Sequence, residues 1–398
     1  MKISKSIAWI TWAIAAIFYA YQYVLRVMPS IMFEELSTQF DIDGKTFGQF
    51  SGIYYIGYAF MHLPIGLLLD RYGPRKIMSV CILLNVAGML PILFSNNWIL
   101  LIAGRLLIGI GSSAAILGTF KIIKLAFSEA HFTRMLSLAV TIGLLGAIYG
   151  GGPVNYLCNQ MGYIFVVELF SIIGLLLAIA TFIIAPDTND EKIEPVLKQL
   201  KTVFKSWKLI FTGIFSGFMV GPLEGFADVW GSQFFKVVYG LDDNLATSLP
   251  SIIFVGMCFG APVLSLMAEK TGKYMGTIVA SGVLMLAIFV ISWGRLLPVS
   301  LISVSFVIVG VCSAFQILAV YKASTYVKSC LSSLAAAIAN MILMSFGYGF
   351  HSVIGYVVDL YSENKVDSYI YGLSVIPISL FIGSIGFFLI SLTDKKSS

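Results

Sequence analysis

Charged residues are scarce in this chain. Only 11% of its 398 residues are Asp, Glu, Lys or Arg, while 58% are hydrophobic. Soluble globular proteins are about 25% charged, and the mean hydropathy here is +0.92. A chain with so little polar surface would not stay in solution, which excludes a soluble globular protein. Lipid is therefore the expected solvent for most of the molecule.

Sequence patterns of metal sites, disulfide frameworks and catalytic centres are also missing. The cysteines are odd in number and form no CxxC or Cys/His cluster; they are Cys81, Cys158, Cys258, Cys312 and Cys330. We interpret them as small packing residues. The GKT at residues 44–46 is not part of a P-loop, because Gln39 stands where the first glycine is needed. With no HExxH and no serine nucleophile elbow either, we expect no enzyme activity, no metal and no cofactor.

Long apolar runs are abundant. Twelve stretches reach the roughly 17–25 residues that span a bilayer, near residues 7–30, 46–69, 77–95, 98–120, 133–155, 161–185, 207–232, 247–268, 274–293, 297–321, 331–358 and 369–391. One long polar segment follows the sixth stretch. We therefore predict an all-α integral membrane fold, with six-helix bundles over residues 1–185 and 206–398 and a cytoplasmic linker over residues 186–205.

The basic residues lie predominantly on one side of these spans. If the N-terminus is inside, cytoplasmic segments hold 19 of the 25 Lys and Arg residues, as the positive-inside rule requires. The remaining six are Arg26, Lys45, Arg105, Lys236, Arg295 and Lys365. Both termini are then cytoplasmic, and the net charge of +5 follows from topology without a nucleic-acid partner.

The segment GLLLDRYGPRK at residues 66–76 joins the second and third spans. Gly66 would allow close helix approach, and Gly73 with the following proline predicts a tight turn. Asp70 can form a charge network with Arg71, Arg75 and Lys76 that holds the cytoplasmic helix ends in one state. The alternative is a positive-inside loop with no switching role.

A degenerate copy of this segment lies 199 residues later, at residues 264–273. Glu269, Lys270 and Gly272 stand where Asp70, Arg71 and Gly73 stood. A repeat at six-helix spacing indicates two homologous halves.

The first copy closely resembles the signature loop of the major facilitator superfamily of secondary carriers. AGRLLIGIGSSAA, which contains Arg105, and GLLGAIYGGGP at residues 143–153 resemble its second and third signatures. The last is a glycine-rich segment that lets two helices cross tightly. The resemblance implies twelve helices in two pseudo-symmetric bundles and transport by alternating access across a bacterial inner membrane. We expect a small-molecule substrate, a proton or another coupling ion, surrounding lipid and a monomeric protein.

Polar residues at membrane depth mark candidate sites. On the first span, Tyr19, Gln22, Tyr23 and Arg26 share one helix face. A guanidinium there favours an anionic group of the substrate, such as a carboxylate or phosphate. The alternative is an arginine that reaches the outer headgroups.

The seventh span carries Glu224 and Asp228 one turn apart. Two adjacent carboxylates repel each other, which suits proton coupling or capture of a substrate ammonium. An acidic helix end, or a salt bridge to Arg26, is the alternative. We also assign Arg105 to coupling.

Two further faces carry tyrosine and histidine. Tyr54, Tyr58 and His62 share a face of the second span, and Asn340, Tyr348 and His351 share a face of the eleventh. We assign Tyr58, Asn340, Tyr348 and His351 to substrate binding, although a structural role for each histidine is equally open.

The segment YAYQYVLRVMP is similar to the first helix of organophosphate/phosphate antiporters, whose Arg grips phosphate. Those carriers have a second Arg on the seventh helix, where Leu223 stands here before Gly225 and Asp228. A single Arg facing acidic residues better fits an amino acid, short peptide or organic acid, moved by proton symport. An organophosphate exchanger and a non-transporting sensor with the carrier fold are the alternatives.

Overall fold

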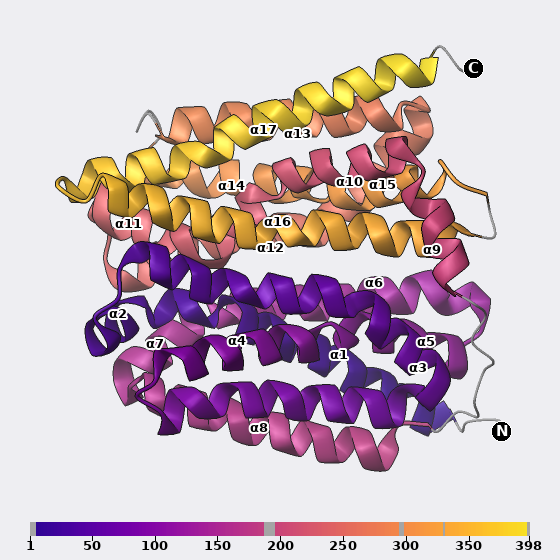
Figure 1. Ribbon diagram of the computed structural model, residues 1–398, viewed down its shortest axis with the longest axis horizontal. Coiled ribbons are helices and arrows are strands. Elements are labelled where there is room, and N and C mark those ends of the chain that lie inside the picture. The colour runs from indigo at the N-terminus through magenta and orange to yellow at the C-terminus, as the bar shows by residue number, and fades with distance from the viewer. Residues whose placement is uncertain (1–4, 187–195, 294–297, 329–330, 396–398) are drawn as a thin grey trace. The chain divides into compact units, whose positions relative to one another are not determined.

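The computed structural model describes residues 5–186, 196–293, 298–328 and 331–395. Among these residues the regular elements are all helices (Figure 1). Within these described ranges, eleven helical segments are long and apolar enough to cross a membrane. The chain divides into two compact units, unit 1 of residues 1–41 and 53–194 and unit 2 of residues 42–52 and 195–398. Arg295 and Cys330, which the sequence analysis named, lie outside the described residues.

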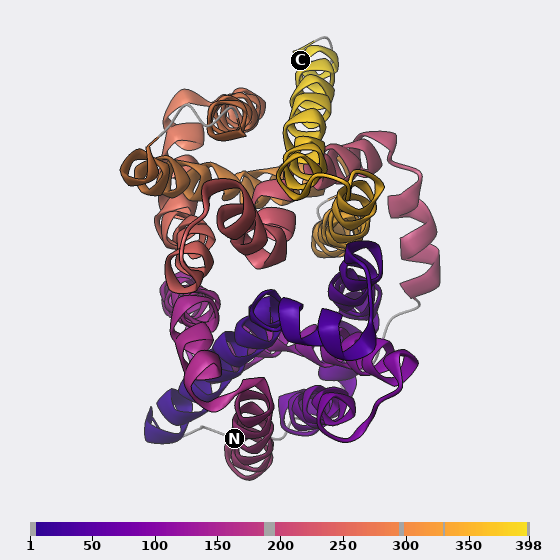
Figure 2. The same ribbon diagram turned by 90° about the vertical axis from the view of Figure 1, so that its left-hand side faces the viewer.

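The elements of unit 1 are α1 (Lys5–Val27), η1 (Met28–Ile31), α2 (Phe33–Phe40), α3 (Gly44–Phe94), α4 (Trp98–Ser112), α5 (Ala114–Ala126), α6 (Glu129–Gly150), α7 (Gly152–Met161) and α8 (Tyr163–Ile184). The first turns of α3 belong to unit 2. Within unit 1, α1 is packed against α5, α6 and α8. The long helices run side by side, as Figure 2 shows close to end-on.

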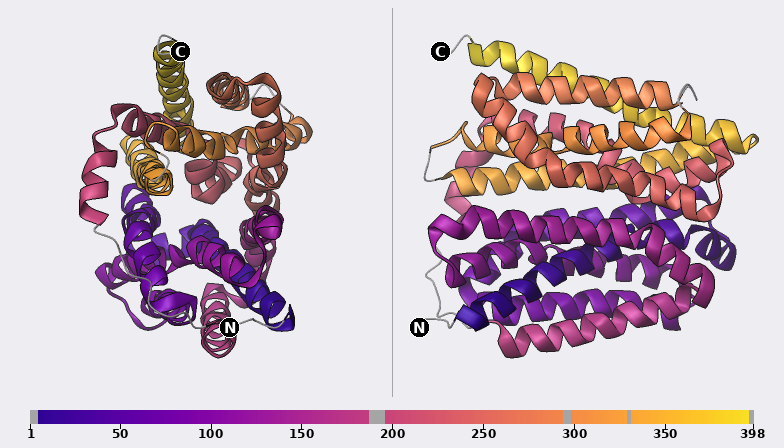
Figure 3. Two further views of the ribbon diagram at one scale, coloured as in Figure 1. Left: turned by 90° about the vertical axis from the view of Figure 1, so that its right-hand side faces the viewer. Right: turned by 180° about the vertical axis from the view of Figure 1, so that it is seen from behind.

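The elements of unit 2 are α9 (Val196–Phe204), α10 (Trp207–Met219), η2 (Gly221–Trp230), α11 (Gly231–Tyr239), α12 (Asp243–Thr271), α13 (Tyr274–Trp293), α14 (Val299–Ser313), α15 (Phe315–Ser324), α16 (Ser332–Leu360) and α17 (Lys365–Lys395). Here α12 packs against α14, α13 against α17, and α10 against α16 and α17. Figure 3 shows these helices from the other sides.

Helix α3 contains two of the predicted spans. Its 51 residues would extend about 75 Å as one straight helix, far more than a bilayer of about 30 Å requires. Gly73 interrupts it with φ 79° and ψ 163°, a conformation that glycine adopts without steric cost. The predicted turn is therefore confirmed, and the two arms of α3 bring the eleven segments to the twelve predicted spans. Gly272, which ends α12, also has a positive φ of 65°, 199 residues later.

The repeat also includes the start of the helix that precedes each turn. At the start of α3, the amide of Thr46 donates a 2.8 Å hydrogen bond to Oδ1 of Asp43. At the start of α12, the amide of Leu245 donates a 3.2 Å hydrogen bond to Oδ2 of Asp242. These aspartates are again 199 residues apart, and each caps free amides of a first turn. Burial acts to raise the pKa of the Asp43 carboxyl, but hydrogen bonds from Thr46 and the charge of Lys45 outweigh it and lower that pKa below its usual range.

Paired glycines allow one close helix contact in each unit. A Cβ on Gly57 would lie 2.5 Å from a carbonyl oxygen of α4, and one on Gly256 would lie 2.0 Å from a carbonyl oxygen of α14. From the facing helices, a Cβ on Gly109 or Gly310 would approach α3 or α12 to 2.1 or 2.0 Å. Such distances leave no room for a side chain, so each pair of backbones touches directly.

The glycine-rich end of the fifth span behaves as its signature implies. A Cβ on Gly146 of α6 would lie 2.1 Å from the carbonyl oxygen of Ala20, and one on Gly143 would lie 2.5 Å from the ring of Tyr19. The expected tight crossing is confirmed, and it places α6 directly against α1.

The seventh span is not a continuous α-helix. Its middle, η2, is a π-helix of 10 residues, in which the amide of Gly231 bonds to the carbonyl of Phe226, five residues earlier. Such wide turns are rare and frequently occur at functional sites. The sequence analysis did not predict it.

Candidate functional site

Arg26 lies in the last turn of α1 and is only 5% exposed. Its guanidinium carbon is 5.1 Å from the ring centre of Tyr23 and 5.2 Å from that of Tyr55. Tyr19 lies one turn before Tyr23 on the same helix, and the two ring centres are 5.3 Å apart. Aromatic faces stabilise a buried cation. Tyr55 was missed because helical periodicity assigned the neighbouring Tyr54 to the site face.

The polar faces of α1 and α3 meet inside unit 1. The hydroxyl of Tyr54 donates a 2.7 Å hydrogen bond to Oε1 of Gln22. Tyr54 stacks on Tyr58 at 6.0 Å and 20° between planes, and the Tyr58 ring lies 5.4 Å from His62. The structure thus brings one arginine, one glutamine and five tyrosines into one cluster, which we call the arginine–tyrosine cluster. Its members are Arg26, Gln22, Tyr19, Tyr23, Tyr54, Tyr55 and Tyr58.

Arg105 of α4 holds the end of α1. Its Nη1 and Nη2 donate to the carbonyl oxygens of Leu25 and Arg26 at 2.6 and 2.7 Å. Its guanidinium carbon lies 4.9 Å from the ring centre of Tyr54. The last carbonyls of a helix need donors from outside, and Arg105 supplies two. It therefore positions Arg26 through the backbone that carries it.

Glu224 and Asp228 are both buried in unit 2, with 0% and 1% exposure. They lie on η2, which packs closely on α16: a Cβ on Gly225 would lie 3.1 Å from Cβ of Phe350. Two carboxylates so close together and away from water are costly if both are ionised.

The structure brings together only some of the residues expected on one face of α16. A Cβ on Gly52 would lie 3.1 Å from both Tyr348 Cα and His351 Cβ, so these two residues pack against the start of α3 within unit 2. His351 is 1% exposed. Asn340 is half-buried, and 11 residues of helix place it about 16 Å from His351 along the axis.

The residues assigned to gating form separate contacts. Oδ1 of Asp70 pairs with Nζ of Lys121 at 3.0 Å, with the aspartate side chain 53% exposed. The structure therefore joins Asp70 to α5, while Arg71 lies over the ring of Tyr72, 5.1 Å from its centre.

Arg75 contacts the end of α8. It donates from Nε and Nη2 to the carbonyl oxygens of Phe182 and Ile183, at 2.5 and 3.0 Å. The close approach expected at Gly66 is not found among the described residues, because a Cβ there would meet Leu117 Cδ1 at an ordinary 3.8 Å.

The second copy of the motif differs from the first. Glu269 and Lys270 are exposed at the end of α12. Lys322, 201 residues after Lys121, pairs with Asp394 at 3.1 Å, and Lys208 pairs with the same carboxylate at 2.8 Å. In unit 2 the carboxylate of this ion pair therefore comes from α17 and not from the motif.

A profile of the Major Facilitator Superfamily matches residues 10–350. The chain belongs to this superfamily. Membership identifies the chain as a multi-pass membrane transporter and not an enzyme, in agreement with its apolar spans.

The quinolone resistance protein NorB of Staphylococcus aureus is 33% identical over 150 residues, which are 36% of this chain and 29% of NorB. The match therefore spans less than a third of that relative. Solved transporters of the same superfamily fold match nearly the whole chain at lower identity. A mutant of the nucleoside transporter NupG has a TM-score of 0.79 at 14% identity and covers 96% of this chain and 99% of its own.

Two other solved structures agree. A bacterial homologue of the human lysosomal transporter Spinster, inward-facing and occupied, has a TM-score of 0.74 at 14% identity, covering 96% of each chain. The D-xylose–proton symporter has a TM-score of 0.71 at 16% identity, covering 94% of this chain and 96% of its own. At such identities the likeness supports the superfamily fold alone.

Proposed function

We propose that this chain is a secondary active transporter that carries a small anionic or zwitterionic metabolite across a bacterial inner membrane. Two homologous bundles, residues 1–185 and 206–398, would alternate access to the substrate, with both termini and the linker at residues 186–205 in the cytoplasm. The observation that carries the proposal is the buried guanidinium of Arg26 in the arginine–tyrosine cluster.

Arg26 suits an anionic group for physical reasons. Its side chain is 5% exposed, and burying a full charge is costly unless other groups stabilise it. The rings of Tyr23 and Tyr55 each contribute on the order of 2 kcal/mol in such a desolvated place. A carboxylate adds two parallel charge-assisted hydrogen bonds in the fork geometry of arginine. Gln22 and Tyr58 offer further hydrogen-bonding groups beside it.

Unit 2 has two buried carboxylates of its own. Glu224 and Asp228 are buried on a π-helix, where one of them can hold a proton or the ammonium group of a zwitterion. An amino acid or a short peptide offers both charges. Leu223, fully buried at 1% exposure, places no second cation beside them, which supports a carboxylate over an organophosphate.

Replacing Arg26 tests the substrate class. A thermal-shift screen of amino acids, dipeptides and organic acids on the purified protein first identifies a ligand. Arg26→Lys keeps the charge but cannot form the bidentate pair, so we expect at least a tenfold rise in the ligand's Kd, or about 1.4 kcal/mol. The amide analogue of the ligand should bind the wild type weakly, and Arg26→Lys should hardly distinguish it from the parent compound. Wild-type affinity in Arg26→Lys, or a neutral best ligand, would refute the anionic-substrate assignment.

Replacing the unit 2 carboxylates tests coupling. In proteoliposomes with an imposed proton gradient, Glu224→Gln or Asp228→Asn should abolish accumulation while counterflow exchange continues, because exchange needs no net proton movement. Accumulation that persists in both variants would remove the pair from coupling. Loss of counterflow as well would assign the pair to substrate binding.

The similarity to NorB favours a second candidate, export of an aromatic compound. The stacked rings of Tyr54 and Tyr58 provide aromatic surfaces for such a substrate. Cells that express the chain would then accumulate less of a fluorescent quinolone than cells that express the Tyr58→Ala variant. Equal accumulation in both would reject this candidate.

A further inference from the structure

A short basic segment precedes the seventh span, at the start of unit 2. Residues 196–208 contain four lysines and no acidic residue. The segment begins with α9, which has 9 residues, and it reaches Trp207, the first residue of the apolar segment Trp207–Tyr239. Clusters of roughly four to eight basic residues beside a membrane span are typical of segments that contact anionic lipid headgroups.

Helix α9 lies across the long helices of unit 2 and is packed onto them. Figure 2 shows α9 lengthwise, in rose, where the long helices are seen close to end-on. Val203 is 0% exposed and shares a buried cluster with residues of α10, α15 and α16, among them Leu209 and Ile338. Leu200 packs against the same cluster. A helix held in this way across the ends of membrane-spanning helices lies parallel to the membrane surface, as interfacial helices do.

Two lysines of the segment stay outside this core. Lys201 and Lys205 are exposed, and neither forms an ion pair with another described residue. Lys208 differs from them, because its ammonium group pairs with Asp394 of α17 at 2.8 Å. The charges of Lys201 and Lys205 are therefore available to a partner outside the described chain, while that of Lys208 holds two helices of unit 2 together.

Two aromatic side chains accompany these lysines. Phe204 and Trp207 are 49% and 50% exposed. The ring centre of Trp207 lies 6.1 Å from that of Phe211, which continues the row of rings along α10. Tryptophan is enriched where lipid headgroups meet the hydrocarbon. The row therefore indicates that α10 leaves the hydrocarbon near Trp207 and that α9 lies at the level of the headgroups.

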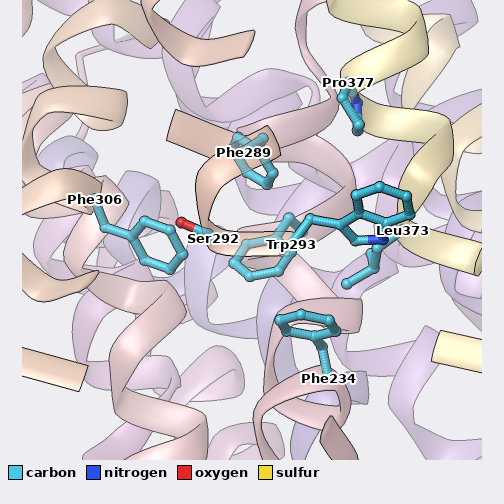
Figure 4. A pocket seen from close by; sticks show the side chains of 8 residues that line it. Phe234, Phe289, Ser292, Trp293, Phe306, Leu373 and Pro377 are labelled. Atoms are coloured by element: carbon cyan, nitrogen blue, oxygen red, sulfur yellow. The ribbon is translucent and has the colours of Figure 1, made fainter. Parts of the chain in front are cut away.

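Aromatic rings in the interior of unit 2 are used differently. Figure 4 shows Phe234, Phe289 and Phe306 turned toward one shared space, where room remains for about one water molecule. Phe289 and Phe306 stack on each other at 6.2 Å with 19° between their planes. These rings pack against one another, whereas Phe204 and Trp207 present theirs outward.

We propose that α9 and the start of α10 bind an anionic phospholipid of the cytoplasmic leaflet. The ammonium groups of Lys201 and Lys205 would donate charge-assisted hydrogen bonds to the lipid phosphate, and the upper acyl chain would pack on the rings of Phe204 and Trp207. The bound lipid would hold α9, and with it one end of the linker between the two bundles, at the membrane surface. The proposal rests on the cytoplasmic side proposed above for the linker and not on the transported substrate.

Native mass spectrometry of the purified full-length protein tests the charge requirement. Anionic phosphatidylglycerol and zwitterionic phosphatidylcholine are titrated separately. In the double variant Lys201→Gln/Lys205→Gln the Kd of phosphatidylglycerol should rise at least about tenfold, while that of phosphatidylcholine should not change. The matched control Lys270→Gln/Lys273→Gln, which removes two exposed lysines from the end of α12, should bind both lipids like the wild type. Equal losses in the two double variants, or an unchanged Kd in the first, would overturn the proposal.

Photolabelling locates the bound lipid. A phosphatidylglycerol analogue with a diazirine in its headgroup is added to the full-length protein in phosphatidylcholine nanodiscs, irradiated, and the labelled peptides are mapped by mass spectrometry. We expect labels within residues 196–208, displaced by unlabelled phosphatidylglycerol but not by millimolar inorganic phosphate. Labels confined to other segments, or displacement by inorganic phosphate, which would indicate a site for soluble anions, would refute the lipid site. Both faces of a nanodisc are accessible, so these outcomes depend neither on the substrate nor on the membrane orientation proposed above.

Discussion

Two buried arginines in unit 1 do different work although they contact the same helix end. Arg26 lies over Tyr23 and Tyr55, while Arg105 donates from two nitrogens to the carbonyls of Leu25 and Arg26. The first presents its guanidinium to a tyrosine-rich wall. The second is committed to backbone oxygens, so its charge serves to hold the last turn of α1. This separates the proposed binding residue Arg26 from a residue that holds a helix end.

We expect Arg105→Lys to lower thermal stability even though it keeps the charge. Lysine has a single nitrogen and cannot reproduce both backbone bonds, and a hydrogen bond to a charged group contributes about 1.5–3 kcal/mol. The melting temperature of the purified protein should fall, and substrate affinity should fall with it because Arg26 loses its fixed position. The number of protons moved per substrate should not change. A changed proton ratio with an unchanged melting temperature would instead support the coupling role expected from the sequence.

At the scale of elements, close helix contacts depend on glycines that periodicity alone does not rank. Gly57 and Gly256 occupy matching places in α3 and α12, and each would place a Cβ within 2.5 Å of a facing carbonyl oxygen. Gly276 of α13 is different, because a Cβ there would meet Lys273 Cβ at a permissible 3.5 Å.

Alanine at these glycines should therefore have opposite effects. Gly57→Ala and Gly256→Ala should each destabilise the protein by about 1–3 kcal/mol, because the helix pair must separate. Gly276→Ala should be neutral or stabilise by up to about 1 kcal/mol, since alanine is the better helix former. Unfolding in denaturant, followed by tryptophan fluorescence, measures all three. Similar losses in all three variants would show that the contacts do not set the cost.

The N-cap of α3 leads to a prediction about pH. The pKa of Asp43 lies below its usual range, so its ionised form stabilises the fold. That contribution is present above the unfolded pKa of about 3.9 and is lost as the pH falls through the native pKa. Asparagine still caps a helix but does not titrate. The melting temperature should therefore fall less steeply between pH 5 and pH 3 in Asp43→Asn than in the wild type. Identical slopes would mean that other carboxylates dominate.

The sequence predicted the spans and the turns well because those features are local. About twenty apolar residues are needed to cross a bilayer wherever they lie. The turn at Gly73 can be predicted from that glycine and the proline that follows it. Features that depend on partners were missed. The π-helix at Gly221–Trp230, the stacking of Tyr55 on Arg26 and the ion pair of Asp70 with Lys121 each depend on which helix lies alongside. Periodicity places a residue on a face but does not say what that face meets.

At the scale of the whole molecule, the two units repeat their helix starts, turns and glycine contacts but not the ion pairs of their corresponding lysines. In unit 1 the motif residue Asp70 pairs with Lys121, whereas in unit 2 the matching Lys322 pairs with Asp394 and leaves Glu269 exposed. If the motif controls alternating access, the two copies cannot contribute equally. The first copy is the candidate latch.

Neutralising or exchanging the charges of Asp70 and Lys121 tests whether their ion pair acts as this latch. The Asp70 side chain is 53% exposed, and an ion pair this open contributes at most about 1 kcal/mol to folding. Asp70→Asn should therefore leave the melting temperature and the substrate Kd nearly unchanged but slow transport severalfold in proteoliposomes, because it alters the balance between transport states. Asp70→Lys combined with Lys121→Asp should restore much of the rate, while either reversal alone should not. Glu269→Gln, the same change in the second copy, should transport like the wild type. A full transport rate in Asp70→Asn, or equal losses in Asp70→Asn and Glu269→Gln, would show that this ion pair is not the latch.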